Sequence, residues 1–549
     1  MIQIMKRYIT LAFIAIMIQN GAFAQNGSLP SRSMTIEGNY NPSMTNAEKI
    51  MPVPAKQKND KEPAAVSYLT EPSVFRNAER APMNVFSENS DGVHIDNLNG
   101  YARFGYGLRN IMDGMVDVGW RMNERDALRF SGFLDSWNSE INDWKSKMYD
   151  GSIRADFNHK FDAMELGVSL SCGLSNYNFR GGTKMTEAIL DASDLMLKTN
   201  SVGASAALSG QIDKFSWYGK AGMEWLSRGG LKINGALRDN SEMLMRINAG
   251  VSMPLGFGTA GLDYRQKSAF YDWTGLKGAV YDNFTTLTFS PYWNITKGDF
   301  MASLGANIDV RTSAGDAFLA SPMINIRYEM KKFSLHAGIT GGLEEYDVKS
   351  LNRISPYWSE AERIRDGYTV YNANVGISYS SATWLSMDLT GGIRHTIDEA
   401  FQLTSEKDTL VTSLIKQQTV DVFYGRMDID MKFAGRTQVH MNVIYNNYLN
   451  VFKDGKMELK PAFDANAYGR FNILRGLDAT LSYRLMLFHR VNGKSMPTVN
   501  DVALTVNYDL TSNLSLYAEG RCLAGGDFYY YAGYRCLAPS GILGVSYRF

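Results

Sequence analysis

The chain has 549 residues, an apolar fraction of 45% that is typical of a folded protein, and equal numbers of basic and acidic residues, 56 of each. This lack of net charge gives no support to nucleic-acid binding, which requires a basic face. After the N-terminus the sequence contains no run of about 18 consecutive apolar residues, so we expect no transmembrane helix.

The N-terminal segment has the pattern of a secretory signal peptide. Lys6 and Arg7 supply the positive charge, residues 9–18 form a short apolar run, and Ala-Phe-Ala at 22–24 fits an A-x-A cleavage site. The apolar run is too short for a membrane-spanning anchor. We therefore assign residues 1–24 to a signal peptide and expect the protein to be exported.

The next segment differs from the rest of the chain in composition. Seven of the 14 prolines fall within residues 25–97, and the polar run PVPAKQKNDKEPAA lies at its centre. Such a stretch cannot bury much apolar surface, which predicts an extended tail rather than a packed domain. We expect this proline-rich tail to lie in the periplasm or inside the lumen of the domain that follows.

From residue 98 onwards, apolar residues recur at every second position, which is the pattern of a half-buried β-strand. The stretch FMASLGANIDV illustrates it, because alternate residues from Ala302 to Val310 are apolar. The residues between them are Ser303, Gly305, Asn307 and Asp309. Such segments run to about ten residues, the length that a tilted strand needs to cross a bilayer.

We count 22 of these segments. Their centres lie near residues 104, 118, 131, 155, 168, 205, 221, 248, 262, 289, 305, 326, 337, 375, 389, 429, 442, 468, 483, 506, 517 and 545. Ten connections are short, such as NERD, HKFD and TKGD, whereas those in the opposite phase are mostly longer, including residues 175–198, 343–369 and 396–420. This alternation predicts an all-β fold, a transmembrane antiparallel up-and-down β-barrel over residues 98–549, with short periplasmic turns and long extracellular loops.

The chain ends in LGVSYRF, and a last strand must pair with the first because an open edge is not tolerated in lipid. In this feature the chain resembles the outer-membrane β-barrel proteins of Gram-negative bacteria, in which a final strand ending in Phe is the usual recognition signal for the barrel-assembly machinery. The resemblance implies that Tyr547 and Phe549 form this signal. It also implies that the assembly machinery and outer-membrane lipid are partners, and that the protein is a multi-pass protein of the outer membrane.

The number of strands indicates the kind of barrel, because barrels of about 22 strands characterise transporters with a plugged lumen. By strand count the chain resembles the barrel of TonB-dependent receptors, which import scarce ligands. The tail at residues 25–97 departs from that family, since it is shorter than their plug domain and rich in proline. The resemblance therefore implies a receptor-like barrel without a full plug domain.

The alternation also predicts which charged side chains face the lumen. These are Arg103, Asp117, Arg121, Arg129, Arg246, Asp309, Arg311, Arg327, Asp428, Asp430 and Arg484. One interpretation is an arginine ladder that guides anionic solutes. The other, which we favour, is that lumen-facing side chains must be polar and pair with one another.

Other residue patterns indicate one possible disulfide and neither a metal site nor a catalytic site. Cys522 and Cys536 flank the last long loop, and the oxidising periplasm would allow a disulfide between them. The six histidines are scattered without metal-ligand spacing, and no catalytic motif is present. We therefore expect no metal, no cofactor and no enzymatic activity.

Two functions are compatible with these features. The first is a transporter or receptor that moves a solute across the outer membrane, which a wide, wet lumen favours. The second is a non-conducting scaffold whose N-terminal tail recruits a periplasmic or cell-envelope partner, which the lysines and prolines of residues 50–63 favour. A periplasmic or surface lipoprotein is a candidate partner; a surface lipoprotein would favour uptake, and a periplasmic repeat protein would favour the scaffold.

Overall fold

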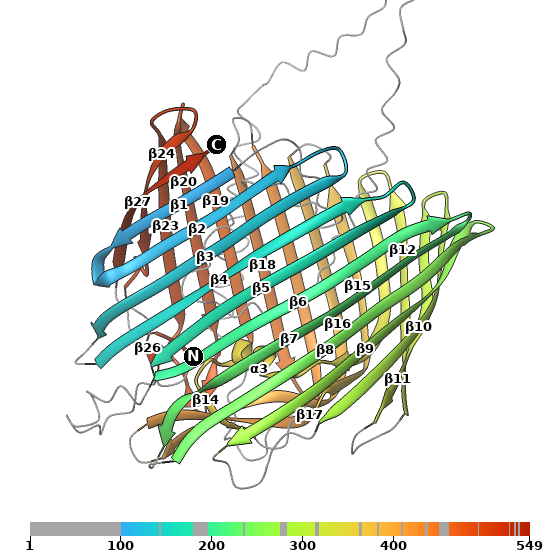
Figure 1. The fold of residues 1–549 in the computed structure, drawn as a ribbon, viewed down its shortest axis with the longest axis horizontal. Coiled ribbons are helices and arrows are strands. Elements are labelled where there is room, and N and C mark those ends of the chain that lie inside the picture. Colours follow the sequence, from blue (N-terminus) through green and yellow to red (C-terminus); the bar gives the residue numbers. More distant parts are fainter. Residues whose placement is uncertain are drawn as a thin grey trace, which may run out of the picture. The chain divides into compact units, whose positions relative to one another are not determined.

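A computed structural model gives the fold of the chain (Figure 1). It describes residues 100–549 except 142–143, 179–195, 234–235, 275–282, 313–317, 362–364, 382–383, 408–409, 434–436, 450–460, 492–493, 526–527, 532–533 and 536–538. The signal peptide and the tail at residues 25–97 lie outside the described residues, so both assignments stay predictions.

The fold is a single closed antiparallel β-barrel. The large sheet has 23 strands, of which β14 (Trp358–Ala361) joins it only by a parallel pairing with β17, and the other 22 form the wall. The first eleven wall strands are β1 (Gly100–Gly107), β2 (Ile111–Arg121), β3 (Asp126–Ile141), β4 (Trp144–Lys160), β5 (Met164–Asn178), β6 (Met196–Ile212), β7 (Phe215–Ile233), β8 (Ala236–Leu255), β9 (Gly258–Thr274), β10 (Phe284–Lys297) and β11 (Phe300–Arg311).

The second half of the wall continues in the same order. It consists of β12 (Phe318–Met330), β13 (Phe333–Glu344), β15 (Gly367–Ser380), β16 (Leu385–Lys407), β17 (Leu410–Lys432), β18 (Gln438–Tyr448), β19 (Phe463–Leu474), β20 (Leu477–Leu487), β23 (Val499–Asp509), β24 (Leu514–Arg521) and β27 (Ser540–Arg548). Each of the 22 strand centres predicted from the sequence falls inside one of these strands, so the predicted strand number and fold class are confirmed.

The smaller elements lie in the connections. They are the 3-10 turn Leu108–Asn110, helix α3 (Val348–Ile354), and the short strands β21 (Arg490–Val491), β22 (Lys494–Ser495), β25 (Tyr529–Tyr531) and β26 (Tyr534–Arg535). Among the described residues, no helix is both long and apolar enough to span a membrane.

The barrel closes where the last strand pairs with the first. β27 runs antiparallel to β1, with Tyr106 opposite Leu543 and Phe104 opposite Val545. At the end of this ladder, the backbone N–H of Gly100 donates to the Phe549 carbonyl at 2.7 Å, and the Phe549 N–H donates back at 2.9 Å. A Cβ at residue 100 would lie 2.1 Å from the Phe549 ring, so a side chain at this position would displace that ring.

The two faces of the wall differ in character, as the period-two pattern requires. The outer face carries large exposed apolar side chains; Phe104, Val375 and Leu543 are each more than half exposed. Exposed aromatic residues lie on the same face, at Trp120, Trp225, Tyr328, Tyr445 and Tyr483. An apolar surface of this extent is stable only in lipid, and a closed barrel satisfies its backbone hydrogen bonds within the bilayer. The fold is therefore that of an outer-membrane barrel.

One of the predicted long connections, residues 396–420, is largely strand. β16 and β17 continue past the barrel wall through residues 396–407 and 410–420, with Phe401 opposite Lys416 and Lys407 opposite Leu410. The stretch is rich in charged and polar residues because it lies beyond the lipid-facing band. It therefore lacks the alternation of a half-buried strand, although its backbone continues the same ladder.

Of the two other long loops predicted from the sequence, one lies largely outside the described residues and one is present. Residues 179–195 lie outside the described part of the chain, and β5 and β6 flank them. The loop predicted at 343–369 is present between β13 and β15, and it contains α3 and β14.

Deleting Phe549 is expected to lower the amount of folded barrel in the outer membrane, because the deletion removes both the closing hydrogen bonds to Gly100 and the proposed assembly signal. The measurement is the fraction of heat-modifiable protein in isolated membranes. Phe549→Tyr is the matched control and should assemble normally. An unchanged folded fraction after the deletion would count against the signal.

Candidate functional site

The most distinctive feature inside the barrel is the segment at residues 345–366, which we call loop A. It connects β13 to β15, and its strand β14 pairs with the tip of β17, where Trp358 lies opposite Ser413. Figure 1 shows α3 and β14 within the outline of the barrel, at the end where the β16–β17 hairpin lies. By the rule that short turns face the periplasm, this long-loop end is the outer mouth.

The local sequence of loop A determines where its helix begins. Asp347 is the N-cap of α3: its carboxylate accepts a hydrogen bond from the Ser350 backbone at 2.6 Å, and the Ser350 hydroxyl accepts one from the Asp347 backbone at 2.7 Å. This reciprocal arrangement is a capping box, which satisfies backbone donors that have no partner within the helix. The helix ends at Ile354, after which the extended residue Ser355 leads the chain toward β14.

Loop A is anchored by apolar side chains that are withdrawn from solvent. Trp358 is fully buried, and it belongs to a cluster that joins loop A to β7 and to the β16–β17 hairpin. The other buried members of this cluster are Leu226, Val348, Leu351, Ala400 and Ile415. The guanidinium of Arg228 lies 4.0 Å from the centre of the Trp358 ring, and Arg228 also donates a hydrogen bond to the Trp358 carbonyl oxygen.

Ion pairs hold the same loop to the inner face of β7, β8 and β9. Arg246 of β8 pairs with Asp347 at 2.7 Å, and Lys267 of β9 pairs with Asp366 at 3.0 Å. Lys349 of α3 pairs with Glu224 of β7 at 3.0 Å. Strands β9 to β12 separate β8 from β13 in the sheet, so loop A crosses the mouth instead of lying along its own strands.

The two loop carboxyls respond differently to this environment. Burial would raise the pKa of Asp347, but Lys267 and Arg246 outweigh it, and the pKa of Asp347 lies below its ordinary value. Burial raises the pKa of Asp366, an effect that Lys267 only partly offsets. Asp347 is therefore ionised at neutral pH, and its contact with Arg246 is a full charge pair.

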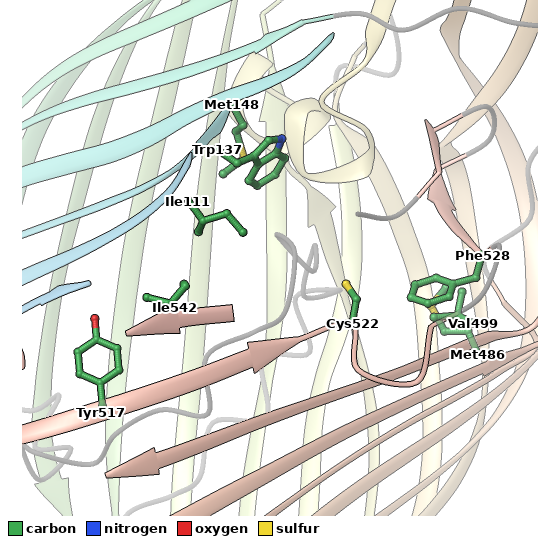
Figure 2. Close-up of a cluster of buried hydrophobic side chains, with 9 residues drawn as sticks. All are labelled: Ile111, Trp137, Met148, Met486, Val499, Tyr517, Cys522, Phe528 and Ile542. Carbon is green, nitrogen blue, oxygen red and sulfur yellow. The ribbon is translucent and has the colours of Figure 1, made fainter. Parts of the chain in front are cut away.

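A second segment folds inward beside the closing seam. Residues 522–539, which we call loop B, connect β24 to β27, and Phe528 of this loop is buried among Met486, Val499 and Cys522 (Figure 2). The Tyr530 hydroxyl donates to Asp501 of β23 at 2.5 Å. Phe528 and Tyr530 therefore hold the described part of loop B against wall strands.

An aromatic contact also joins loop A to β5. Tyr177 of β5 packs against the cluster that contains Phe528, and its ring centre lies 6.1 Å from that of Tyr357 in loop A. The same cluster includes Trp137 and Met148 from the neighbouring strands β3 and β4 (Figure 2). The described parts of loop A and loop B thus each contact the inner wall through aromatic side chains.

A buried ion network lies along the seam. Arg103 of β1 pairs with Asp113 of β2 at 2.6 Å and with Glu519 of β24 at 2.5 Å. Arg521 pairs with Glu519 at 2.6 Å and with Asp135 of β3 at 3.3 Å. The network therefore links strands on both sides of β27.

Cross-strand register places the eleven charged residues singled out in the sequence on one face of the sheet, the face that contacts loop A. Most of them have an oppositely charged partner: Arg129 pairs with Asp117, Arg246 with Asp347, Arg327 with Glu329, Arg484 with Asp464, and Asp428 with Arg426. Asp430 accepts a hydrogen bond from His440 if that ring is protonated at Nδ1. Mutual pairing along the wall agrees better with the second interpretation than with a ladder of arginines available to solute.

Sequence reasoning missed the residues of loop A. The pattern Asp347-x-x-Ser350 is a capping signal that could have indicated the helix. Nothing local indicates that Asp366 meets Lys267, because the two residues are brought together only by the crossing of the mouth. Among the described residues, no group of three or more His, Cys, Asp or Glu side chains could hold a metal ion.

The cysteines are only partly described. Cys172 is exposed and lies opposite Ile153, whose side chain is on the outer face. Cys522 is buried at the base of loop B, and Cys536 lies outside the described residues. The disulfide between Cys522 and Cys536 therefore stays a prediction.

Labelling of thiols in the denatured, unreduced mature protein tests that disulfide. The parent protein is expected to react at Cys172 alone, whereas Cys522→Ser should react at Cys172 and at the released Cys536. A polyethylene-glycol maleimide resolves the number of labelled thiols on a gel. Labelling of three thiols in the parent would exclude the bond, and Cys172→Ser provides the control that identifies the single reactive site.

Comparison with known proteins places the fold. No protein-family model and no curated protein sequence matches the chain. Among solved structures it is similar to the siderophore receptor PirA from Acinetobacter baumannii, with 12% sequence identity, a TM-score of 0.64, and 83% of this chain and 81% of that chain covered. A variant of the ferric enterobactin receptor PfeA from Pseudomonas aeruginosa, in complex with enterobactin, gives 12% identity, a TM-score of 0.63, and 82% and 81% coverage.

The copper transporter OprC is similar to the same extent, with 11% identity, a TM-score of 0.60, and 82% and 80% coverage. At these identities the likeness concerns the fold. The chain thus shares the barrel fold of these receptor and transporter structures, and its 22 wall strands confirm the strand count predicted from the sequence.

Proposed function

We propose that this protein is a non-enzymatic outer-membrane transporter that moves a solute through its barrel, and that loop A closes the outer mouth between transport events. The observation that carries the proposal is the attachment of loop A across the mouth. Ion pairs between a mouth-lining loop and the wall can break and re-form, as a movable gate requires. The similar structures include two receptors for siderophores and a copper transporter, which supports transport as the general function.

Under this proposal the remaining parts have assigned roles. The tail at residues 25–97 restricts the lumen or contacts a periplasmic partner, and a surface lipoprotein is a candidate partner at the outer mouth. The barrel-assembly machinery inserts the barrel by way of Tyr547 and Phe549. The scaffold function is the alternative, and it requires that the lumen stays closed whatever happens to loop A.

Single-channel recording in a planar bilayer separates the two functions. Four forms are compared: the mature protein, a form without residues 25–97, a form in which residues 346–365 are replaced by a short Gly-Ser linker, and a form with both changes. We expect the mature protein to be closed and the doubly changed form to conduct strongly. A silent doubly changed form that is correctly folded would contradict transport and favour the scaffold.

A further inference from the structure

A row of cationic side chains crosses the inner wall directly beneath loop A. In the register of the sheet, Arg246 of β8 lies opposite Lys267 of β9, Lys267 lies opposite Thr286 of β10, and Thr286 lies opposite Arg311 of β11. Directly paired residues on one face have Cβ atoms about 5 Å apart. The four residues therefore form one continuous row, which we call the cation row.

The acidic partners of the cation row come mainly from loop A. Asp347 and Glu345 lie 2.7 Å and 3.5 Å from Arg246, and Asp366 and Glu345 lie 3.0 Å and 3.7 Å from Lys267. The wall itself contributes a longer contact, from Glu224 to Arg246 at 3.9 Å. The Lys267 side chain is only 5% exposed, so these loop carboxylates satisfy a charge that water does not reach.

Arg311 extends the row along β11, where Asp309 of the same strand interacts with it electrostatically. Its side chain is largely buried, and within the described part of the chain its Nε has no hydrogen-bond partner. The hydroxyl of Thr286, beside it in the row, is also buried and unpaired. Buried donors without a partner cost free energy, which indicates that the row offers more donors than loop A accepts.

Other charged groups of the inner wall differ in this respect. Arg129 pairs with Asp117 of the neighbouring strand β2, and Arg484 pairs with Asp464 of the neighbouring strand β19. Both acidic partners belong to the rigid sheet, so no loop movement would release those arginines. The closest counter-charges of Arg246 and Lys267, in contrast, belong to loop A and would leave with it, although Glu224 of the wall would remain near Arg246.

From this arrangement we infer that the cation row is the binding surface for an anionic group of the solute, a carboxylate or a phosphate, and that the carboxylates of loop A occupy the same surface in the closed state. Arg and Lys bind carboxylate and phosphate oxygens through the same charge-assisted hydrogen bonds. Loop A and the solute therefore compete for the cation row, and an anion that binds there shifts the population toward the open loop. The inference rests on the proposed transport function and specifies its substrate class.

Calorimetric titration of the mature protein in lipid nanodiscs tests the inference, with citrate and inorganic phosphate as separate probes. The variant Asp347→Asn/Asp366→Asn removes two competing charges and preserves the shape of loop A. At position 347, asparagine caps helices as well as aspartate does. At position 366, its side-chain oxygen can still accept the hydrogen bond that the Tyr346 backbone N–H donates to Asp366 at 2.9 Å. We expect this variant to bind at least one probe about tenfold more tightly than the parent.

Two further variants show whether the gain depends on the cation row. Adding Arg246→Gln/Lys267→Gln should abolish binding, whereas adding Arg129→Gln, a wall arginine outside the row, should leave it unchanged. Preference for citrate or for phosphate identifies the carboxylate or the phosphate as the group recognised. Equal affinities of parent and loop variant, or binding that survives loss of Arg246 and Lys267, would overturn the inference. Binding does not require conduction, so this result is independent of the bilayer recordings.

Discussion

Replacing Arg103 by methionine is expected to destabilise the closed barrel by about 3–5 kcal/mol, the range typical of removing one partner from a buried ion pair. The Arg103 side chain is 5% exposed, and its partners Asp113 and Glu519 are 0% and 5% exposed. The substitution would leave the carboxylates of Asp113 and Glu519 close together without the guanidinium that pairs with both of them. Because Glu519 and Arg103 lie on strands on either side of β27, we expect the seam to open first.

The measurement is the urea midpoint of unfolding of the protein in lipid vesicles, followed by tryptophan fluorescence. Arg327→Met is the matched control, since its contact with Glu329 at 3.3 Å is between side chains that are about half exposed. A pair of this kind is worth roughly 0–1 kcal/mol. Equal midpoints for the two variants would show that the seam network does not stabilise closure.

Replacing Trp358 by alanine is expected to release loop A while leaving the barrel folded. Truncating a fully buried tryptophan typically costs about 3–5 kcal/mol. Here the lost contacts attach loop A to Leu226 and Ile415 of the wall and hairpin, so the cost applies to the docking of the loop. A change of this size would raise the open population on the order of a hundredfold or more.

Trypsin reports this opening, because loop A contains four cleavage sites, Lys349, Arg353, Arg363 and Arg365. In proteoliposomes, we expect trypsin to cleave residues 345–366 faster in Trp358→Ala than in the parent. On a gel, the unheated variant should still migrate as the folded barrel. Trp120→Ala removes an exposed tryptophan from the lipid-facing surface and should be cleaved like the parent. Equal rates for Trp358→Ala and the parent would show that Trp358 does not hold the loop.

The sequence predicts the wall well because the wall follows a local rule. Alternation of apolar and polar residues depends only on which face meets lipid, so strands centred near Ile326 and Leu389 could be located without knowledge of their neighbours. The rule fails for residues 396–420, where β16 and β17 continue past the wall and apolar residues such as Phe401 and Ile415 are buried in clusters instead of facing lipid.

The mouth is harder to predict for a different reason. Loop A meets β7, β8 and β9 through pairs that are distant in sequence, such as Arg246 with Asp347 and Arg228 with Trp358. Those contacts depend on the diameter of the barrel and on the path of the loop, which no short stretch of sequence specifies. The charged residues of the wall could therefore be predicted from the alternation of the strands. Their partners in loop A could not be predicted in this way.

The most direct test of a movable mouth is a reversible tether between loop A and the wall. Lys349→Cys and Glu224→Cys replace an ion pair whose lysine side chain is 53% exposed, and serine replaces Cys172, Cys522 and Cys536. A cross-linker with an internal disulfide joins the new thiols, and single-channel current is recorded from the form without residues 25–97 before and after reduction. The account predicts a closed channel while the tether is intact and opening events after reduction. The same conductance in both states would contradict it.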